Sequence, residues 1–191
     1  MPDLPDLPDV PDLLDLLAAR TPTLGPARLL CVDGPAGSGK TTLADAVAAA
    51  TGAVVVHLDD LYDGWDGLDD VHLQLTTLLR PLATSLPGRF RRYDWHAGRF
   101  AETVTVAPAD LAAAGLLVVE GVGAGARQTA DLATVLVWVE APSEERLRRG
   151  LERDGEALRG HWLAWREAED AHHAAHGTRA RADLVVDGTR R

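Results

Sequence analysis

The stretch VDGPAGSGKTT, residues 32–42, decides the fold of this chain. Gly34, Gly39, Lys40 and Thr41 satisfy the pattern G-x-x-x-x-G-K-[ST]. An apolar run over 29–32 precedes the pattern, and an alanine-rich stretch over 41–50 follows it. This order predicts a buried strand, then a glycine-rich loop, then a helix, which is the context that the pattern requires.

A loop of this kind binds phosphate groups. Its glycines let backbone N–H groups turn inward around phosphate oxygens, and the positive end of the following helix dipole adds to the attraction. Lys40 would neutralise the β and γ phosphates of ATP, and the Thr41 hydroxyl would bind Mg²⁺, which prefers oxygen ligands. The candidate nucleotide-binding residues are Gly34, Pro35, Ala36, Gly37, Ser38, Gly39, Lys40, Thr41 and Thr42.

The composition is that of one folded domain. The chain has 191 residues, of which 46% are hydrophobic and 25% charged, with a formal charge of −10 that argues against broad nucleic-acid binding. No apolar run approaches the roughly 20 residues that span a bilayer, and acidic residues occupy the place of a secretory signal, so we expect a cytoplasmic protein. Cys31, the only cysteine, is expected in the core. The oligomeric state stays open, and a homo-oligomer is compatible with the sequence.

Residues 1–20 form an acidic arm and residues 21–191 the domain. The repeat PDLPDLPDVPDL over 2–13 contains prolines that block helix and sheet until Pro11, which can sit in the first turn of a short helix. The leucines that follow would give that helix an apolar face for docking on the domain. These residues are Leu13, Leu14, Leu16 and Leu17.

Beyond the glycine loop, apolar runs alternate with helical patterns. We predict strands at 53–58, 116–120, 134–139 and 184–186. We also predict three helices: one at 71–82, one that begins near the capping residue Ser143, and one at 157–175. Alternation of this kind predicts an α/β fold of three layers, with a mainly parallel central sheet of about five strands. Two weaker alternating segments, 89–93 and 102–106, would form an excursion that carries substrate contacts.

The segment HLDDLY, residues 57–62, follows a predicted strand directly. Asp59 and Asp60 are therefore expected where ligands of open α/β sheets bind, and a carboxylate there could take the proton of an attacking hydroxyl. Neighbours at a strand end project in roughly opposite directions, so only one of the two is expected to face the glycine loop. We find neither an NKxD segment of GTPases nor an LSGGQ signature of transporters, and the small size favours a kinase.

The chain resembles the uridine kinase-like nucleoside kinases, which are relatives of phosphoribulokinase and pantothenate kinase among the P-loop kinases. The resemblance covers about 28–188 and rests on motifs in the same order: DGPAGSGKTT, HLDDLY, RYDW, VVEGV, RLRRGLERD and RARADLVVDG. It implies that Asp59 is the catalytic base, that Tyr62 contacts the acceptor sugar, and that Tyr93 packs on a base. The family places a histidine about four residues after the YDF segment, whereas His96 follows Trp95 immediately, so base identity stays open.

Two further parts of the site follow from the same resemblance. Glu120 ends a strand beside the loop, where it could orient magnesium-bound water. A lid around 144–160 would close over the triphosphate, with Arg149 and Arg153 stabilising the transferred phosphoryl group. The spacing places Arg146 on the same helical face as Arg149 and Arg153, and Arg148 on another face. The alternative to phosphate binding is that these arginines form surface ion pairs with nearby glutamates.

The sequence thus predicts ATP-dependent phosphorylation of a hydroxyl on a small molecule, with a nucleoside as the leading acceptor, as in uridine/cytidine kinases. Two alternatives remain. One is a kinase for another metabolite, such as a nucleoside monophosphate, a sugar or a pantothenate-like alcohol. The other is a regulatory protein that binds nucleotide without transferring phosphate.

Overall fold

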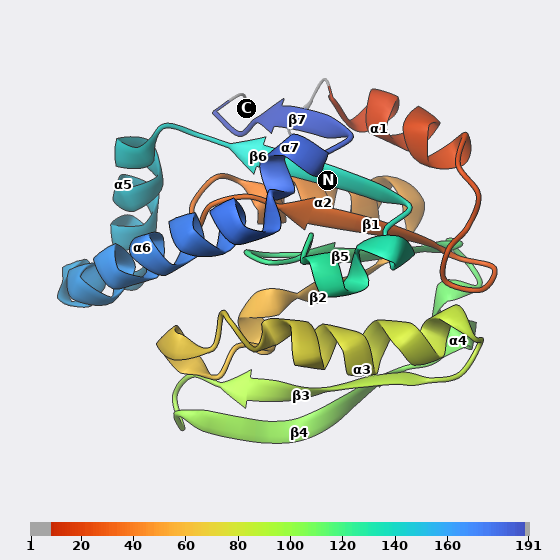
Figure 1. Cartoon of the computed structure of the whole chain (residues 1–191), viewed down its shortest axis with the longest axis horizontal. Helices are drawn as coiled ribbons and strands as arrows, with labels where there is room; N and C mark the ends of the chain where they lie inside the picture. Colours follow the sequence, from red (N-terminus) through yellow and green to blue (C-terminus); the bar gives the residue numbers. More distant parts are fainter. Residues whose placement is uncertain (1–8, 190–191) are drawn as a thin grey trace.

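The computed structural model describes residues 9–189 of the chain. A five-stranded sheet in the order β2-β5-β1-β6-β7 forms its centre (Figure 1). Every neighbouring pair in this sheet is parallel, which confirms the predicted mainly parallel sheet. In sheet order the strands are Val54–His57 (β2), Leu116–Glu120 (β5), Arg28–Asp33 (β1), Val135–Glu140 (β6) and Leu184–Asp187 (β7).

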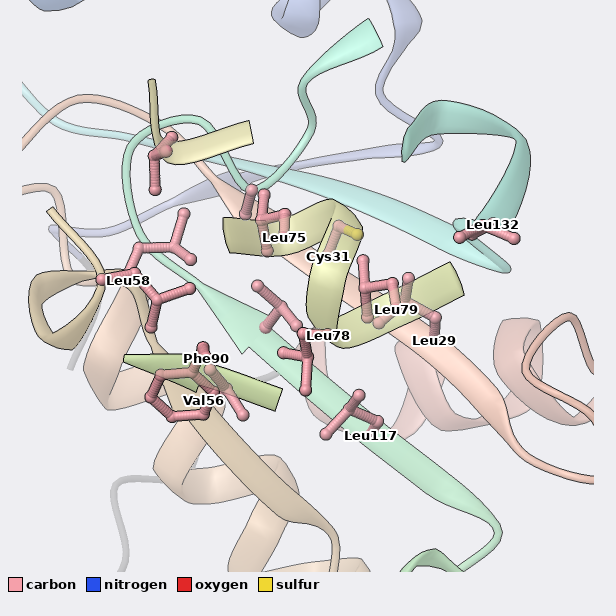
Figure 2. Packing of buried hydrophobic residues seen from close by; sticks show 14 of the residues in the cluster. Leu29, Cys31, Val56, Leu58, Leu75, Leu78, Leu79, Phe90, Leu117 and Leu132 are labelled. Carbon is pink, nitrogen blue, oxygen red and sulfur yellow. The ribbon is translucent and has the colours of Figure 1, made fainter. Parts of the chain in front are cut away.

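Alternate residues of β1 point to opposite faces of the sheet, and each face has its own core. Leu29 and Cys31 belong to the cluster that contains the buried leucines of α3 (Val71–Ala83), as Figure 2 shows. Leu30 and Val32 belong to the other cluster, with α1 (Asp9–Ala18) and α2 (Lys40–Thr51). Because a strand has a two-residue side-chain period, one apolar run supplies both cores and gives the three layers.

The predicted excursion is an antiparallel hairpin of β3 (Gly88–Asp94) and β4 (Arg99–Val106). It lies against α3 on the side away from the main sheet (Figure 1). Gly88 allows this approach, because a Cβ there would lie 2.0 Å from the backbone oxygen of Leu78. The short helix α4 (Pro108–Leu111) returns the chain to β5.

Helices α5 (Ser143–Asp154), α6 (Arg159–His176) and α7 (Thr178–Arg181) follow β6. Ser143 is the first helical residue of α5 and Pro142 takes the cap position without a side-chain hydrogen bond, so the predicted capping role of Ser143 was wrong. The 3₁₀ turns of the chain lie at Leu58–Asp60 (η1), Gly64–Asp66 (η2), Arg127–Leu132 (η3) and Glu156–Leu158 (η4).

The N-terminal arm is described from α1 onward. Leu13 and Leu17 are buried and join the core on the α2 side, as the docking face predicts. The part of the proline repeat that precedes Asp9 lies outside the described residues. Over residues 9–189, every helix is too short or too polar to cross a membrane.

Candidate phosphate-binding and acceptor site

The glycine loop connects β1 to α2 and requires glycine at several positions. Gly34, Gly37 and Gly39 have φ values of 141°, 77° and 106°, which L side chains rarely adopt. A Cβ at Gly34 would also lie 2.1 Å from the backbone oxygen of Val139. Lys40 begins α2, so the helix N-terminus and its free N–H groups face the loop.

Asp33, the last residue of β1, anchors the loop from behind. Its buried carboxylate accepts hydrogen bonds from the backbone N–H groups of Gly34, Gly123 and Gly125, at 2.7, 3.0 and 2.8 Å. The Nε2 atom of His173 lies 3.2 Å from the same carboxylate. Burial raises the pKa of Asp33, but the bonds from His173 and the backbone outweigh it and lower the pKa overall. Sequence reasoning missed this anchor.

A cavity of about 1110 Å³ opens in front of the loop. This volume lies slightly above the range of roughly 300–1,000 Å³ that is usual for small-molecule sites. Most of the predicted site residues line the cavity: Ala36, Gly37, Gly39, Lys40, Thr41, Thr42, Asp59, Tyr62, His96, Glu120, Arg149 and Arg153. The remaining predicted residues lie outside its lining: Gly34, Pro35, Ser38 and Tyr93.

Glu120 is held between the loop and β2. Its Oε1 accepts a hydrogen bond from the Thr41 hydroxyl at 3.1 Å and lies 2.7 Å from Nδ1 of His57. Strand register explains the contact, since His57 on β2 is directly opposite Glu120 on β5. The hydrogen bond to Glu120 raises the pKa of His57. Carboxylate and hydroxyl oxygens are the donors that Mg²⁺ prefers, so Thr41 and Glu120 fit such an ion.

Asp59 also lines the cavity. It sits in the turn η1 directly after β2, and the indole N–H of Trp95 donates to its backbone oxygen at 2.8 Å. Its side chain is exposed within the cavity, whose walls partly exclude water from it. This desolvation raises the pKa of Asp59, and the Glu120 charge adds to the effect, while Lys40 and Arg153 oppose it.

The structure corrects the reason given for preferring Asp59 over Asp60. Strand β2 ends at His57, and both aspartates lie in a 3₁₀ turn closed by the bond from Leu61 N–H to Leu58 O at 2.8 Å. Strand alternation therefore does not apply to them, and both line the cavity. The assignment of Asp59 as the base stays a prediction, now supported by the opposing charges of Lys40 and Arg153 around it.

Indole rings form one wall of the cavity. The ring of Trp65 lies 5.6, 6.5 and 6.0 Å from those of Trp95, Trp162 and Trp165, and all four residues line the cavity. Trp162 and Trp165 are buried packing residues, and they also line the cavity. Sequence reasoning missed Trp65 and Trp95 because these rings converge only in three dimensions.

The two predicted substrate tyrosines have protein partners. Tyr62 is buried, donates its hydroxyl to Val122 O at 2.8 Å, and presents its ring edge to Trp165 at 4.9 Å. Tyr93 packs on Trp95 and Phe100, at 5.2 and 5.3 Å between ring centroids. Their substrate contacts stay predictions, and Trp95, which packs on Tyr93, lines the cavity in its place.

The arginines of α5 divide as the helical spacing predicts, with one exception. Arg149 and Arg153 line the cavity, and Arg149 donates to Gly188 O at 3.1 Å. Both also form ion pairs on their own helix, Arg149 with Glu145 at 2.8 Å, as the alternative expects, and Arg153 with Asp154 at 2.7 Å. Arg148 lies on the exposed side and pairs with glutamates of its own helix. Arg146 shares the predicted face but is buried in an ion pair with Glu169 at 2.7 Å, so it needs no anionic ligand.

Comparison with known proteins agrees with this geometry. A family model described as an AAA domain matches residues 30–172. A possible uridine kinase from Bacillus stearothermophilus has a TM-score of 0.68 and 23% identity, covering 95% of this chain and 100% of its own. A candidate fructose transport system kinase from Silicibacter sp. TM1040 has a TM-score of 0.62 and 20% identity. The match covers 92% of this chain and 96% of that kinase.

No curated protein sequence matches the chain significantly. At these identities the two solved structures show the fold alone, and that fold is the one the sequence resemblance implies. The chain therefore belongs to the AAA domain family and has the α/β P-loop fold of uridine kinase-like proteins.

Proposed function

We propose that this protein is an ATP-dependent phosphotransferase that phosphorylates a hydroxyl group of a small molecule, with a nucleoside as the leading acceptor. One observation carries the proposal. The carboxylate of Asp59 shares a cavity with Lys40, Thr41 and Arg153, so a candidate base and candidate phosphate ligands face the same space. Phosphoryl transfer needs this juxtaposition of acceptor and donor sites.

The nucleotide side of the site would be built from the glycine loop. Backbone N–H groups of the loop and of the α2 N-terminus would bind the phosphates, and Lys40 would neutralise their charge. Thr41 and Glu120 would hold Mg²⁺, which supplies charge neutralisation and orients the phosphate oxygens when it is bound. Arg149 and Arg153 would offset negative charge on the transferred group.

On the acceptor side, Asp59 would take the proton of the attacking hydroxyl. The hydroxyl oxygen forms a bond to the γ-phosphorus as the bond from that phosphorus to the β–γ bridging oxygen breaks. The hydroxyl proton passes to Asp59, and ADP leaves with the electron pair of the broken bond. A raised pKa suits this role, because it makes the carboxylate a stronger proton acceptor.

The indole wall supports an acceptor that contains a flat ring. Trp65, Trp95 and Trp162 line the same cavity as Asp59, and aromatic pairs favour stacked or edge-to-face contacts. His96 also lines the cavity, and its ring nitrogens could donate a hydrogen bond to a heterocycle or accept one from it. These features favour a nucleoside over an acyclic alcohol or a simple sugar.

The test is ADP release from MgATP with a panel of acceptors. The panel contains uridine, cytidine, purine nucleosides, nucleoside monophosphates, hexoses and pantothenate. We expect release that depends on a nucleoside, with the phosphorylated product identified by mass spectrometry. ADP release only with an acceptor other than a nucleoside would favour the alternative kinase. ATP binding without ADP release for any acceptor of the panel would favour a regulatory protein.

A further inference from the structure

One face of α6 fastens the glycine loop from behind. The Oε2 atom of Glu169 accepts the backbone N–H of Ala36 at 2.7 Å, and Glu169 is fully buried. One helical turn further, Nε2 of His173 meets Asp33 at the start of the loop, at 3.2 Å. Residues four apart share a helix face, so a single face of α6 contacts the loop at two points.

Arg146 completes the contact from α5. Its Nη1 donates to Oε1 of Glu169 at 2.7 Å and to the backbone oxygen of Ala36 at 3.4 Å. Its Nε donates to Ala141 O at 3.2 Å. Ala36 therefore gives both of its backbone polar groups to the buried pair formed by Arg146 and Glu169.

The loop and α5 are also in direct steric contact. A Cβ at Gly37 would lie 2.5 Å from the backbone oxygen of Arg146 and 3.0 Å from its Cα. The glycine loop thus rests against the first turns of α5, while the buried pair closes the gap behind it. Movement of either helix would change the position of Ala36.

We propose that Arg146 and Glu169 are positioning residues for the nucleotide, and this inference rests on nucleotide binding as proposed above. A phosphate loop binds tightly only when its N–H groups are already oriented, because ordering a glycine-rich segment costs conformational entropy. The pair fixes the Ala36 segment between α5 and α6 and so supplies that order. Neither residue lines the cavity, so they act through the loop and not by touching the ligand.

Charge makes the two partners unequal. Glu169 places a buried negative charge directly behind a loop that would bind a triphosphate, and Arg146 neutralises it. Removing Arg146 leaves this carboxylate uncompensated, so it would both loosen the loop and repel phosphate. Replacing Glu169 by Gln removes the negative charge and leaves a positive one, which attracts phosphate even as the loop loosens.

The experiment measures the Kd of a fluorescent non-hydrolysable ATP analogue with Mg²⁺ for full-length variants. We expect Arg146→Met to raise Kd by at least about tenfold, which corresponds to about 1.4 kcal/mol. Glu169→Gln should raise Kd by a smaller factor. The double variant should bind more tightly than Arg146→Met, because the unpaired carboxylate is gone. Glu167→Gln, an exposed change on the same helix, is the matched control and should bind like wild type.

Thermal unfolding of each variant without nucleotide distinguishes a role in positioning the loop from a role in stability alone. Binding is measured well below every melting midpoint, so a purely structural pair would lower the midpoint and leave Kd unchanged. If Arg146→Met does not fold, Arg146→Lys and Glu169→Gln carry the test, since lysine keeps the charge but lacks the fork that reaches two acceptors.

Two results would overturn this inference and leave the proposed function standing. One is a wild-type Kd in all folded variants. The other is an equal increase of Kd in Arg146→Met and Glu169→Gln without recovery in the double variant. Failure of the wild-type protein itself to bind the analogue would overturn the proposed function, and this inference with it.

Discussion

At the scale of the residue, two aspartates close to the loop have opposite electrostatic roles. Asp33 is surrounded by donors, and its pKa lies below the ordinary value. Asp59 lies in a recess with another carboxylate nearby, and its pKa lies above the ordinary value. The first stabilises the fold in its ionised form, whereas the folded protein disfavours the ionised form of the second, as is common for catalytic groups.

This contrast predicts opposite effects of the same isosteric change on stability. The depressed pKa of Asp33 contributes stability that is present above its unfolded pKa and is lost as pH falls through the folded pKa. Asp33→Asn should therefore lower the free energy of unfolding at pH 7 by about 2–3 kcal/mol, the scale of hydrogen bonds to a charged group. Asp59→Asn should leave it equal or higher. Urea denaturation measures both, and a larger loss in Asp59→Asn would contradict the account.

Lys40 is the only lysine in the sequence, so no other lysine can replace it in the cavity. Its Nζ donates to Pro35 O at 2.9 Å, within reach of the loop. We expect Lys40→Ala to reduce turnover by a few hundredfold, or about 3–4 kcal/mol of transition-state stabilisation, with the fold retained. The check is kcat alongside circular dichroism. Turnover close to wild type would exclude the phosphate-binding role.

At the scale of the element, α5 separates its arginines by function. Arg148 forms its ion pairs with glutamates of the same helix on the exposed side, and such surface pairs contribute little to stability. Arg149 bridges to the glycine loop and to Gly188, and Arg153 reaches the cavity. One helix thus carries an exposed face, a cavity face and the buried Arg146.

We expect Arg149→Ala and Arg153→Ala each to lower kcat by at least about tenfold, because each removes a cation from the cavity. Arg148→Ala, the matched control on the exposed side, should change kcat by less than about twofold. Initial rates at saturating ATP measure all three. Equal losses at all three positions would show that the helical faces do not determine function.

At the scale of the whole molecule, the sheet places chemistry from distant segments at one edge. The carboxyl ends of β1, β5 and β2 bring Asp33, Glu120 and His57 together, as is general for parallel sheets. Behind this edge lies the core, and Cys31 sits within it on the central strand. Burial raises the pKa of the Cys31 thiol to about 12.

The thiol therefore reports on global unfolding. Native protein should react with a thiol reagent at pH 8 far more slowly than urea-unfolded protein, because a buried thiol is neither ionised nor accessible. Reagent kinetics across a urea series should follow the unfolding transition seen by circular dichroism. Fast, stoichiometric reaction of the native protein would contradict the placement of β1 in the core.

Local pattern predicted much of this fold because the strands are continuous apolar runs. Strand 116–120 is observed at the predicted bounds, and the glycine loop, the hairpin and the α5 faces also follow from spacing. What spacing could not predict was the turn after β2, where a local hydrogen bond replaces strand geometry and turns both aspartates toward the cavity.

Contacts between distant segments were likewise beyond the sequence. Trp65 and Trp95 come from separate loops, and Arg146 meets Glu169 across 23 positions of chain. Each residue alone reads as an ordinary packing or surface residue. Only the packing of α5 and α6 against the glycine loop and η2 gives these side chains their shared surroundings.

The central claim is that a hydroxyl held at Asp59 receives the phosphoryl group. The most direct test compares turnover and ATP affinity for Asp59→Asn and Asp60→Asn with the identified acceptor. Asparagine keeps the shape but cannot take the proton, so Asp59→Asn should bind ATP normally and lose at least ~10²-fold in kcat, while Asp60→Asn stays close to wild type. An inactive Asp60→Asn beside an active Asp59→Asn, or full activity in both, would contradict the account.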